Sequence, residues 1–271
     1  MLAQSRGYVT VDLDSVQTRL NRSDHVFFEI ARLVGVHGLA LDYLVAWLRS
    51  RSIEANPVDG VIDPEELQSR YPDIDTRAAL KECLEELYRD YALTYEFRLA
   101  MLQICRSHIA GVSHCAPAVE QWLRGELRRI SEVKEAKLFS KIGRHNARLM
   151  LQSLSRWLRQ NGRKGFVLCL DLGRCLEQVR PAERTGGLYY SSPALTEVYE
   201  VLRQLVDASA DFAGTLIVVY APPAFLENEK RGVDRYQALK MRIFADIHMS
   251  GRQNPLSPLY RLALQETAEA P

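Results

Sequence analysis

The sequence has no large excess of charge and no long run of apolar residues. Its 35 lysines and arginines are nearly balanced by 34 aspartates and glutamates, which gives a formal net charge of +1 at pH 7. No global field therefore favours nucleic acid or an acidic partner, and such binding would need a local patch. No stretch approaches the roughly 20 apolar residues that span a bilayer, and the N-terminus lacks the apolar core of a signal peptide. We predict a cytoplasmic protein that contacts no membrane.

Cysteines are few, and their spacing does not suggest a disulfide or zinc framework. The sequence contains five of them with no CxxC pair: Cys83, Cys105, Cys115, Cys169 and Cys175. An odd, scattered set favours buried free thiols in a reducing compartment. The sequence neighbours His108, His114 and Cys115 could suggest zinc ligands, but no second paired cluster accompanies them. A structural role for these three side chains is favoured.

A helix that leads directly into an apolar strand, within residues 142–172, is the strongest pattern in the sequence. Leucines and Trp157 recur at helical spacing, which predicts an amphipathic helix over residues 144–160. Asn161 and Gly162 tolerate the left-handed backbone conformation that a helix end needs. The helix should therefore end there, and a strand should follow after a short turn.

Residues 165–171 run apolar without alternation and end in Asp171. Such a run is typical of a strand that is buried on both faces of a parallel sheet. Strand ends in open α/β sheets face the ligand crevice, and in nucleotidases the carboxylate at this place holds Mg²⁺. Asp171 is therefore the candidate metal ligand. The next residue is Leu172, where an ATP-hydrolysing protein commonly has a glutamate that activates water.

Further strands and helices surround this pair. Strands are predicted over residues 7–13, closed by Asp12 and Asp14, and over residues 214–221. Alternation of apolar strands with helices predicts an α/β protein with a parallel, doubly wound sheet. An exposed loop is predicted over residues 176–187. Helices are predicted over residues 25–34 and 39–48, from Pro64, over 76–109 with a break near 92–94, and over 116–130, 193–208 and 235–247.

This pattern divides the chain into three parts. Residues 1–50 and 141–250 should form an α/β core, residues 51–140 a helical insertion, and residues 251–271 a tail that partly frays. Basic and acidic residues alternate late in the insertion, which favours a solvated helix face over a surface that tracks phosphates. The basic residues are Arg124, Arg128, Arg129, Lys134, Lys137 and Lys141, and the acidic ones are Glu126, Glu132 and Glu135.

The sequence contains no GxxxxGK followed by Ser or Thr, the run whose backbone amides cradle phosphate. Residues 162–165, GRKG, lead into a strand instead of joining a strand to a helix, so we interpret them as a plain turn. At the start of the central helix, Asn146 should cap or orient the first turn. The alternative is an anion or nucleotide site made by Arg144, Asn146 and Arg148 at that helix start.

Five stretches carry a resemblance to a known family. In chain order they are RGYVTVDLDS, RHNARLMLQSLSRWLRQNGRKGFVLCLDL, YEVLRQLVD, TLIVVYAPPAFLE and GVDRYQALKMRI. Together they resemble the P-loop ATP-binding proteins of BREX phage-defence systems, of the AAA-type ATPase group. The resemblance covers residues 6–12 weakly and 142–245 better. It implies a P-loop/AAA-like fold with a helical insertion, incomplete here because the P-loop strand and helix would precede residues 6–12.

The resemblance assigns roles to single residues and also marks departures. Asp171 matches the metal-binding position, and Arg242 lies in the helix where a trans-acting arginine would be sought. A solvent-facing helix arginine is the alternative for Arg242. The phosphate loop is missing, Leu172 replaces the expected glutamate, and residues 221–223, APP, stand where a polar sensor would follow the later strand.

The resemblance thus implies a degenerate, non-hydrolysing relative that acts as an assembly or regulatory subunit in phage defence. ATP and Mg²⁺ would be held only through an oligomeric partner, and no catalytic residue is predicted. One alternative is a fragment of an active ATP-binding protein, which an in-frame GxxxxGK[ST] upstream of the Met1 codon would favour. Another is a nucleic-acid-binding module that uses the helical block and the Arg144–Arg148 helix start, with weak, salt-dependent binding.

We expect a homo- or hetero-oligomer with other defence-system proteins. A sheet that lacks the P-loop strand should leave apolar surface and unpaired backbone groups exposed, which a folded protein in water seldom tolerates. Either the predicted strands close up beside one another, or a partner covers the gap, and we favour the partner.

Overall fold

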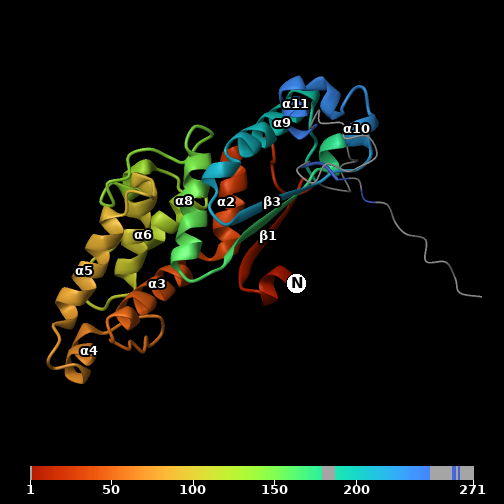
Figure 1. The fold of residues 1–271 in the computed structure, drawn as a ribbon. Coiled ribbons are helices and arrows are strands. Elements are labelled where there is room, and N and C mark those ends of the chain that lie inside the picture. The colour runs from red at the N-terminus through yellow and green to blue at the C-terminus, as the bar shows by residue number, and fades with distance from the viewer. Residues whose placement is uncertain (1, 179–186, 245–257, 261, 263–271) are drawn as a thin grey trace, which may run out of the picture.

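The computed structural model describes residues 2–178, 187–244, 258–260 and 262. Its three strands are β1 Tyr8–Asp14, β2 Gly165–Asp171 and β3 Thr215–Tyr220. The helices are α1 Leu2–Ser5, α2 Ser23–Val34, α3 Val36–Ser50, α4 Pro64–Arg70, α5 Thr76–Arg89, α6 Tyr95–Ser107, α7 Ala116–Leu123, α8 Ala147–Gln160, α9 Ser192–Asp207, α10 Ala224–Glu227 and α11 Gln237–Ile243. The molecule is elongated, with α4 and α5 at one end and α9 to α11 at the other (Figure 1).

The strands lie in the order β1-β2-β3, and both pairs are parallel. The α/β fold with a parallel sheet is therefore confirmed, and so are the three predicted strands. The strands do close up beside one another: Asp14 pairs in register with Asp171, and Asp171 pairs with Tyr220. All three carboxyl ends meet at one edge of the sheet, as a parallel arrangement requires.

The two faces of the sheet are covered unequally. On one face α2 packs on β1 and α8 packs on β2, and Phe166, Leu168 and Leu170 are buried there. On the other face Val167 and Cys169 are only half-buried. The prediction of a strand buried on both faces is therefore correct for one face only. An unbroken apolar run does not reveal that the second face has fewer covering elements.

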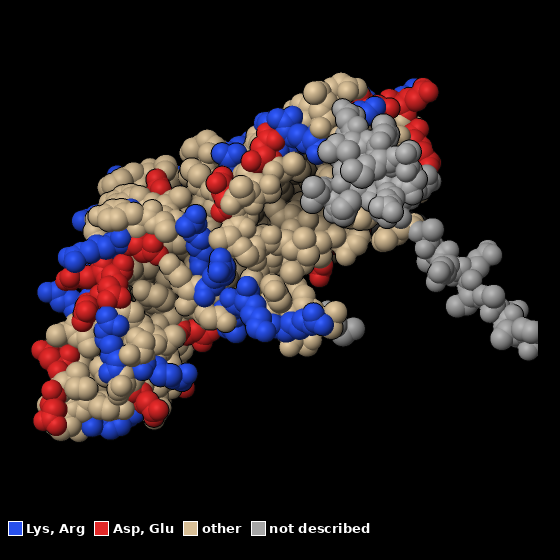
Figure 2. Space-filling model, viewed as in Figure 1, with Lys and Arg blue, Asp and Glu red and all other residues tan. Residues whose placement is uncertain are grey.

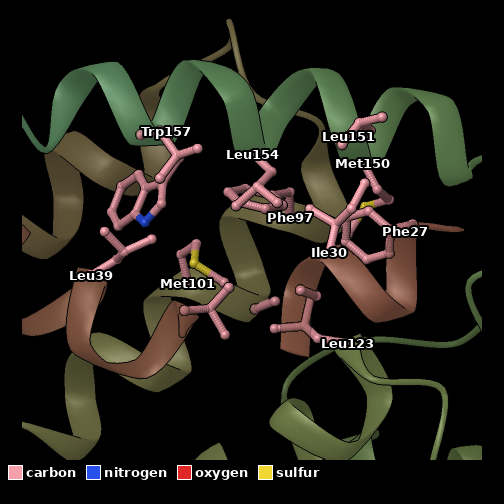
Figure 3. Close-up of a cluster of buried hydrophobic side chains, with 14 of the residues drawn as sticks. Phe27, Ile30, Leu39, Phe97, Met101, Leu123, Met150, Leu151, Leu154 and Trp157 are labelled. Carbon is pink, nitrogen blue, oxygen red and sulfur yellow. The ribbon is translucent and has the colours of Figure 1, made fainter. Parts of the chain in front are cut away.

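Helix α8 joins the sheet to the helical block through a shared core. Its apolar side chains, among them Leu154 and Trp157, point between α2 and α6 toward Phe27 and Phe97 (Figure 3). Leu154 and Trp157 are both fully buried, and the ring centroid of Trp157 lies 4.6 Å from that of Tyr43. One continuous hydrophobic cluster extends through both parts. The amphipathic central helix is confirmed, whereas the proposed domain boundaries remain a prediction.

Helix breaks follow local side-chain chemistry. The predicted break near residues 92–94 is confirmed, because α5 ends at Arg89 and α6 starts at Tyr95. The carboxylate of Asp90 accepts a hydrogen bond from the backbone N–H of Ala92 at 3.0 Å, which stabilises the connecting turn. The predicted helix over residues 116–130 is wrong at its end, since α7 stops at Leu123.

Gly125 explains this early stop of α7. Its φ of +71° is a left-handed conformation that favours glycine, and an added Cβ would lie 2.5 Å from the Phe28 ring. The chain turns there to pack against α2, and only a short 3₁₀ turn, Ile130–Val133, follows. A contact between distant segments thus overrides the helical pattern of residues 124–130.

The remaining helical predictions hold with small shifts at the ends. The helix predicted over residues 235–247 is seen as α11, and its last three residues lie outside the described part. Most of the predicted 176–187 loop and nearly all of the 251–271 tail also lie outside it. Among the described residues no single helix could cross a membrane. Only α2 and α3 taken together have the required length and composition, and they are bent by 58°.

Truncation of the α8 core face should weaken the whole fold. We expect Leu154→Ala to lower the free energy of unfolding by about 2–5 kcal/mol, because the side chain is fully buried between two helical layers. The matched control Leu149→Ala removes the same atoms from a side chain of α8 that is 43% exposed, and should cost only about 0.5 kcal/mol. Urea unfolding of both variants tests this. Similar losses would contradict the role given to α8.

Candidate functional site

Two acidic residues from strands that are distant in the sequence, Asp14 and Asp171, lie side by side at the carboxyl edge of the sheet. Asp171 ends β2 and is exposed, and its Oδ1 accepts a hydrogen bond from the backbone N–H of Gly173 at 2.7 Å. Asp14 ends β1, and its Oδ1 accepts the backbone N–H groups of Val16 and Gln17, both at 2.8 Å. Each carboxylate therefore shapes the turn that follows its strand, as Asp side chains commonly do. Asp171 remains open to solvent at the predicted place.

Leu172 points away from this edge. Its side chain is fully buried in the core, while its backbone N–H donates to the carbonyl oxygen of Tyr220 at 2.9 Å. A glutamate at this position would have to bury its charge, so the backbone itself does not present residue 172 to a nucleotide. After β3, Pro222 and Pro223 lead into the short helix α10 and supply no polar side chain.

The ATP–Mg²⁺ group implied by the sequence resemblance can be compared with these residues. Mg²⁺ commonly uses one or two protein carboxylates and takes its other ligands from water and phosphate. Asp171 fits that need. No group of three or more His, Cys, Asp or Glu side chains that could hold a metal occurs in the described part of the chain. The carboxyl edge therefore presents one exposed carboxylate at the end of β2, Asp171, whose role as a metal ligand remains a prediction.

A buried arginine that the sequence analysis did not identify, Arg231, contacts the segment that follows β2. The guanidinium of Arg231 donates to the carbonyl oxygens of Cys175 and Tyr190, both at 2.7 Å. The Tyr190 hydroxyl in turn donates to the carbonyl oxygen of Thr18 at 2.6 Å. These bonds tie the segment after β1 to the segments before α9 and after α10. Nothing in the local sequence distinguishes Arg231 from an exposed arginine, because its guanidinium donates to backbone carbonyls of distant segments.

Cys175 belongs to the same buried cluster. Burial raises the pKa of its thiol to about 12, with smaller opposing effects from Ser15 and Tyr190. The thiol is therefore protonated at neutral pH and is a poor nucleophile. All five cysteines are free, as expected, and three of them are buried.

The predicted anion site at the start of α8 is occupied by internal contacts. Arg144 forms a two-point ion pair with Glu197 of α9, with N···O distances of 2.9 and 3.2 Å. Asn146 does not cap the helix; its Oδ1 accepts the backbone N–H of Gly143 at 2.8 Å, so it orients the preceding turn instead. Arg148 is exposed beside them. The site stays a prediction, and Arg144 is the residue least available for it.

Arg242, the candidate trans-acting arginine, holds α11 on α9. Its Nε donates to Asp207, and its Nη1 donates to the carbonyl oxygen of Ala238 at 2.5 Å. The hydrogen bond from Arg242 lowers the pKa of Asp207. About two turns earlier on α9, Glu200 accepts hydrogen bonds from Arg203 and from Tyr236. These pairs favour the structural alternative for Arg242, and the trans-acting role remains untested.

The zinc interpretation of the histidines loses support in the structure. His108 is buried, with Nδ1 at 2.6 Å from the carbonyl oxygen of Gly60 and Nε2 at 3.0 Å from that of His37. Both ring nitrogens are engaged with the backbone, so His108 links α6 to α3 and to the turn before α4. These backbone contacts favour the structural role for His108.

Comparisons with known proteins return one family. The family model described as "BREX system ATP-binding protein BrxC/D" matches residues 1–269 of the 271-residue chain. No curated protein and no solved structure matches the chain. The family match extends over the helical block as well as over the strands, whereas the residues that carried the resemblance lay mainly in the strands and their helices.

The contacts of Glu200 make the α9–α11 packing sensitive to acid. Arg203 lowers the pKa of Glu200 from 4.5 to about 2. A lowered pKa contributes stability above the unfolded value of 4.5, and this stability is lost as the pH falls toward 2. We expect Glu200→Gln to lower the thermal stability at pH 7. The variant should also lose less stability than the wild type as the pH falls from 4.5 toward 2. Glu135→Gln, at an exposed glutamate, is the control, and an equal effect would count against this assignment.

Proposed function

Because the chain belongs to the BREX system ATP-binding protein BrxC/D family, a phage-defence family, we propose that it is an assembly or regulatory subunit that does not hydrolyse ATP by itself. The observation that carries the proposal is the uncovered edge of β3. Leu216, Val219 and Tyr220 on this strand are 58%, 40% and 52% exposed. Exposed apolar area of this kind on a strand favours a site that another polypeptide covers.

The backbone of β3 supports the same proposal. Hydrogen bonds from Phe166 N to Gly214 O and from Leu172 N to Tyr220 O set the alternation along the pair β2–β3. Because a parallel ladder uses alternate residues, Ile217 and Val219 direct their peptide groups away from β2. No strand in the described part of the chain pairs with them.

Natural edge strands usually carry a charge, a proline or a bulge that prevents pairing. The β3 sequence, TLIVVY, has neither charge nor proline. It is therefore suited to receive an added strand. The added strand can belong to another subunit or, in the fragment alternative, to an ATP-binding segment of the same polypeptide. Either source would cover the apolar residues of β3 and complete the sheet beside Asp171.

The family description also names ATP binding, so the proposal includes a nucleotide. Asp171 is exposed at the carboxyl edge and would hold Mg²⁺, which offsets phosphate charge when a nucleotide is bound. Leu172 cannot activate water, and the two prolines after β3 cannot contact a phosphate by hydrogen bonds from their N atoms. A nucleotide at this edge would therefore depend on a phosphate cradle from the polypeptide that joins β3.

The isolated 271-residue chain should release no phosphate from ATP above background. The groups that position and stabilise the transferred phosphoryl group are worth several orders of magnitude in rate, and Leu172 supplies none of them. Phosphate release by the purified chain and by Asp171→Asn measures this. Turnover that is typical of ATPases and is abolished by Asp171→Asn would contradict the proposal.

The isolated chain should also self-associate at micromolar concentration or bind a hydrophobic dye through β3. Replacing both Leu216 and Val219 by lysine should suppress association and dye binding, because charges on an edge strand oppose pairing. Leu149→Lys, at a similarly exposed leucine of α8, is the matched control and should change neither property. Sedimentation velocity gives the decision. A compact wild-type monomer that binds no dye would refute the assembly proposal.

A further inference from the structure

The segment that contains α8 and leads into β2 is strongly basic, although the whole chain is nearly neutral. Residues 143–170 contain no aspartate or glutamate. Six cations lie in the same segment: Arg144, Arg148, Arg156, Arg159, Arg163 and Lys164. This differs from the insertion, where glutamates interrupt the basic residues. A local positive patch of this kind can act even when the net charge does not.

Internal ion pairs remove two of these cations from the patch. Arg144 is bound to Glu197, and Arg163 is bound to Asp42 at 2.8 Å. Of the other four, Arg148 lies at the start of α8, away from the rest. The side chains of Arg156, Arg159 and Lys164 are exposed and have no ion pair or hydrogen bond with the described residues. They are charges for which the described fold supplies no counterion.

The fold adds a fourth cation from the start of the chain. The backbone N–H of Lys164 donates to the carbonyl oxygen of Gly7 at 3.0 Å, so Arg6 and Lys164 enter neighbouring strands at the same edge. Arg6 is exposed and has no acidic partner among the described residues. Arg159 reaches the same place, since a Cβ added to Gly214 would lie 2.8 Å from its Cδ. Three sequence-distant segments therefore meet at the amino edge of the sheet.

Figure 2 shows the result on the surface. Lysine and arginine side chains form a band that runs over the end of α8 and on toward the N-terminal segment, with few acidic side chains beside it. We call Arg6, Arg156, Arg159 and Lys164 the basic band. A hollow of about 470 Å³ adjoins it, lined by Arg6 and Lys164 and by the apolar side chains of Val167 and Leu216. Tyr8, which is 37% exposed, also lines this hollow.

We propose that the basic band binds the phosphate backbone of a nucleic acid. Unpaired cations that follow one another along a surface fit a polymer with one negative charge on each nucleotide. The hollow gives the same surface an aromatic ring on which an unpaired base can stack. Nucleic-acid binding is not part of the assembly function proposed above. The band also differs from the Arg144–Arg148 helix start suggested by the sequence, because Arg144 is neutralised by Glu197.

The proposal fixes how binding should depend on salt. Each phosphate contact contributes roughly −0.9 to the slope of log K against log salt for duplex DNA, so four contacts give a slope of about −3.6. Because the net charge is +1, we expect this slope to come from the band and not from a field of the whole protein.

The test uses the full chain and fluorescently labelled duplex and single-stranded DNA of mixed sequence, with anisotropy measured from about 50 to 200 mM salt. We expect salt-dependent binding by the wild type. Arg159→Glu combined with Lys164→Glu should weaken it at least about 30-fold at low salt and reduce the slope by about 2. The tighter of the two DNA forms identifies the source of the phosphates, and a loss confined to single strands in Tyr8→Ala would identify base stacking.

The matched control combines Arg128→Glu with Lys134→Glu. Both residues are exposed and unpaired among the described residues, and the charge change is the same, but they lie in the mixed-charge insertion. Their replacement should leave affinity within about threefold of wild type. Arg159→Lys combined with Lys164→Arg keeps both positive charges and should therefore retain binding. Equal losses in the two charge-reversed proteins, or no wild-type binding to either DNA at low salt, would overturn the proposal.

Discussion

Burial of the apolar face of α8 is the constraint on which the rest of the structure depends. This one helix packs on β2 on one side and between α2 and α6 on the other, so it joins the sheet to the helical block in one hydrophobic core. The opposite face of α8 is exposed to solvent and carries its arginines, among them Arg156 and Arg159. The same burial that stabilises the fold therefore arranges Arg156 and Arg159 on the surface and delivers Lys164 to the start of β2.

Three of the sheet's borders differ in chemistry as a consequence. The carboxyl edge carries Asp171 in solvent and is closed on one side by the buried Arg231 cluster. The side edge along β3 is apolar and unpaired within the described residues, which suits an added strand. The amino edge carries the basic band. The proposed assembly contact and the proposed polyanion surface therefore lie mainly on different borders and adjoin at Leu216, which is exposed on β3 and also lines the hollow beside the basic band.

The chemistry of the carboxyl edge also depends on backbone direction. Asp171 and Leu172 are adjacent, but one side chain is exposed and the other is fully buried. A glutamate at residue 172 would therefore place its charge in the core and not at the carboxyl edge. The way in which β2 ends, and not only the residue at position 172, therefore keeps this side chain away from the carboxyl edge.

The sequence by itself determined the elements with strong local patterns. Period and capping residues located α8, the break before α6 and all three strands, and the apolar strands implied a parallel sheet, because these signals depend on near neighbours. It also placed Asp171 at the carboxyl edge, since every parallel strand ends there. The end of α7 at Gly125 could not be predicted, because it results from a contact with Phe28 of another helix.

Only the tertiary structure decided which charges are free and which edges are open. Arg144 and Arg242 looked available in the sequence, yet each is held by a carboxylate from α9, whereas Arg159 and Lys164 are not held by any described residue. The buried Arg231 was likewise not predicted, and the expected exposed apolar surface could not be assigned to β3 from the sequence. Ion pairing and solvent exposure are set by the segments that folding brings together, and one-dimensional patterns do not contain that information.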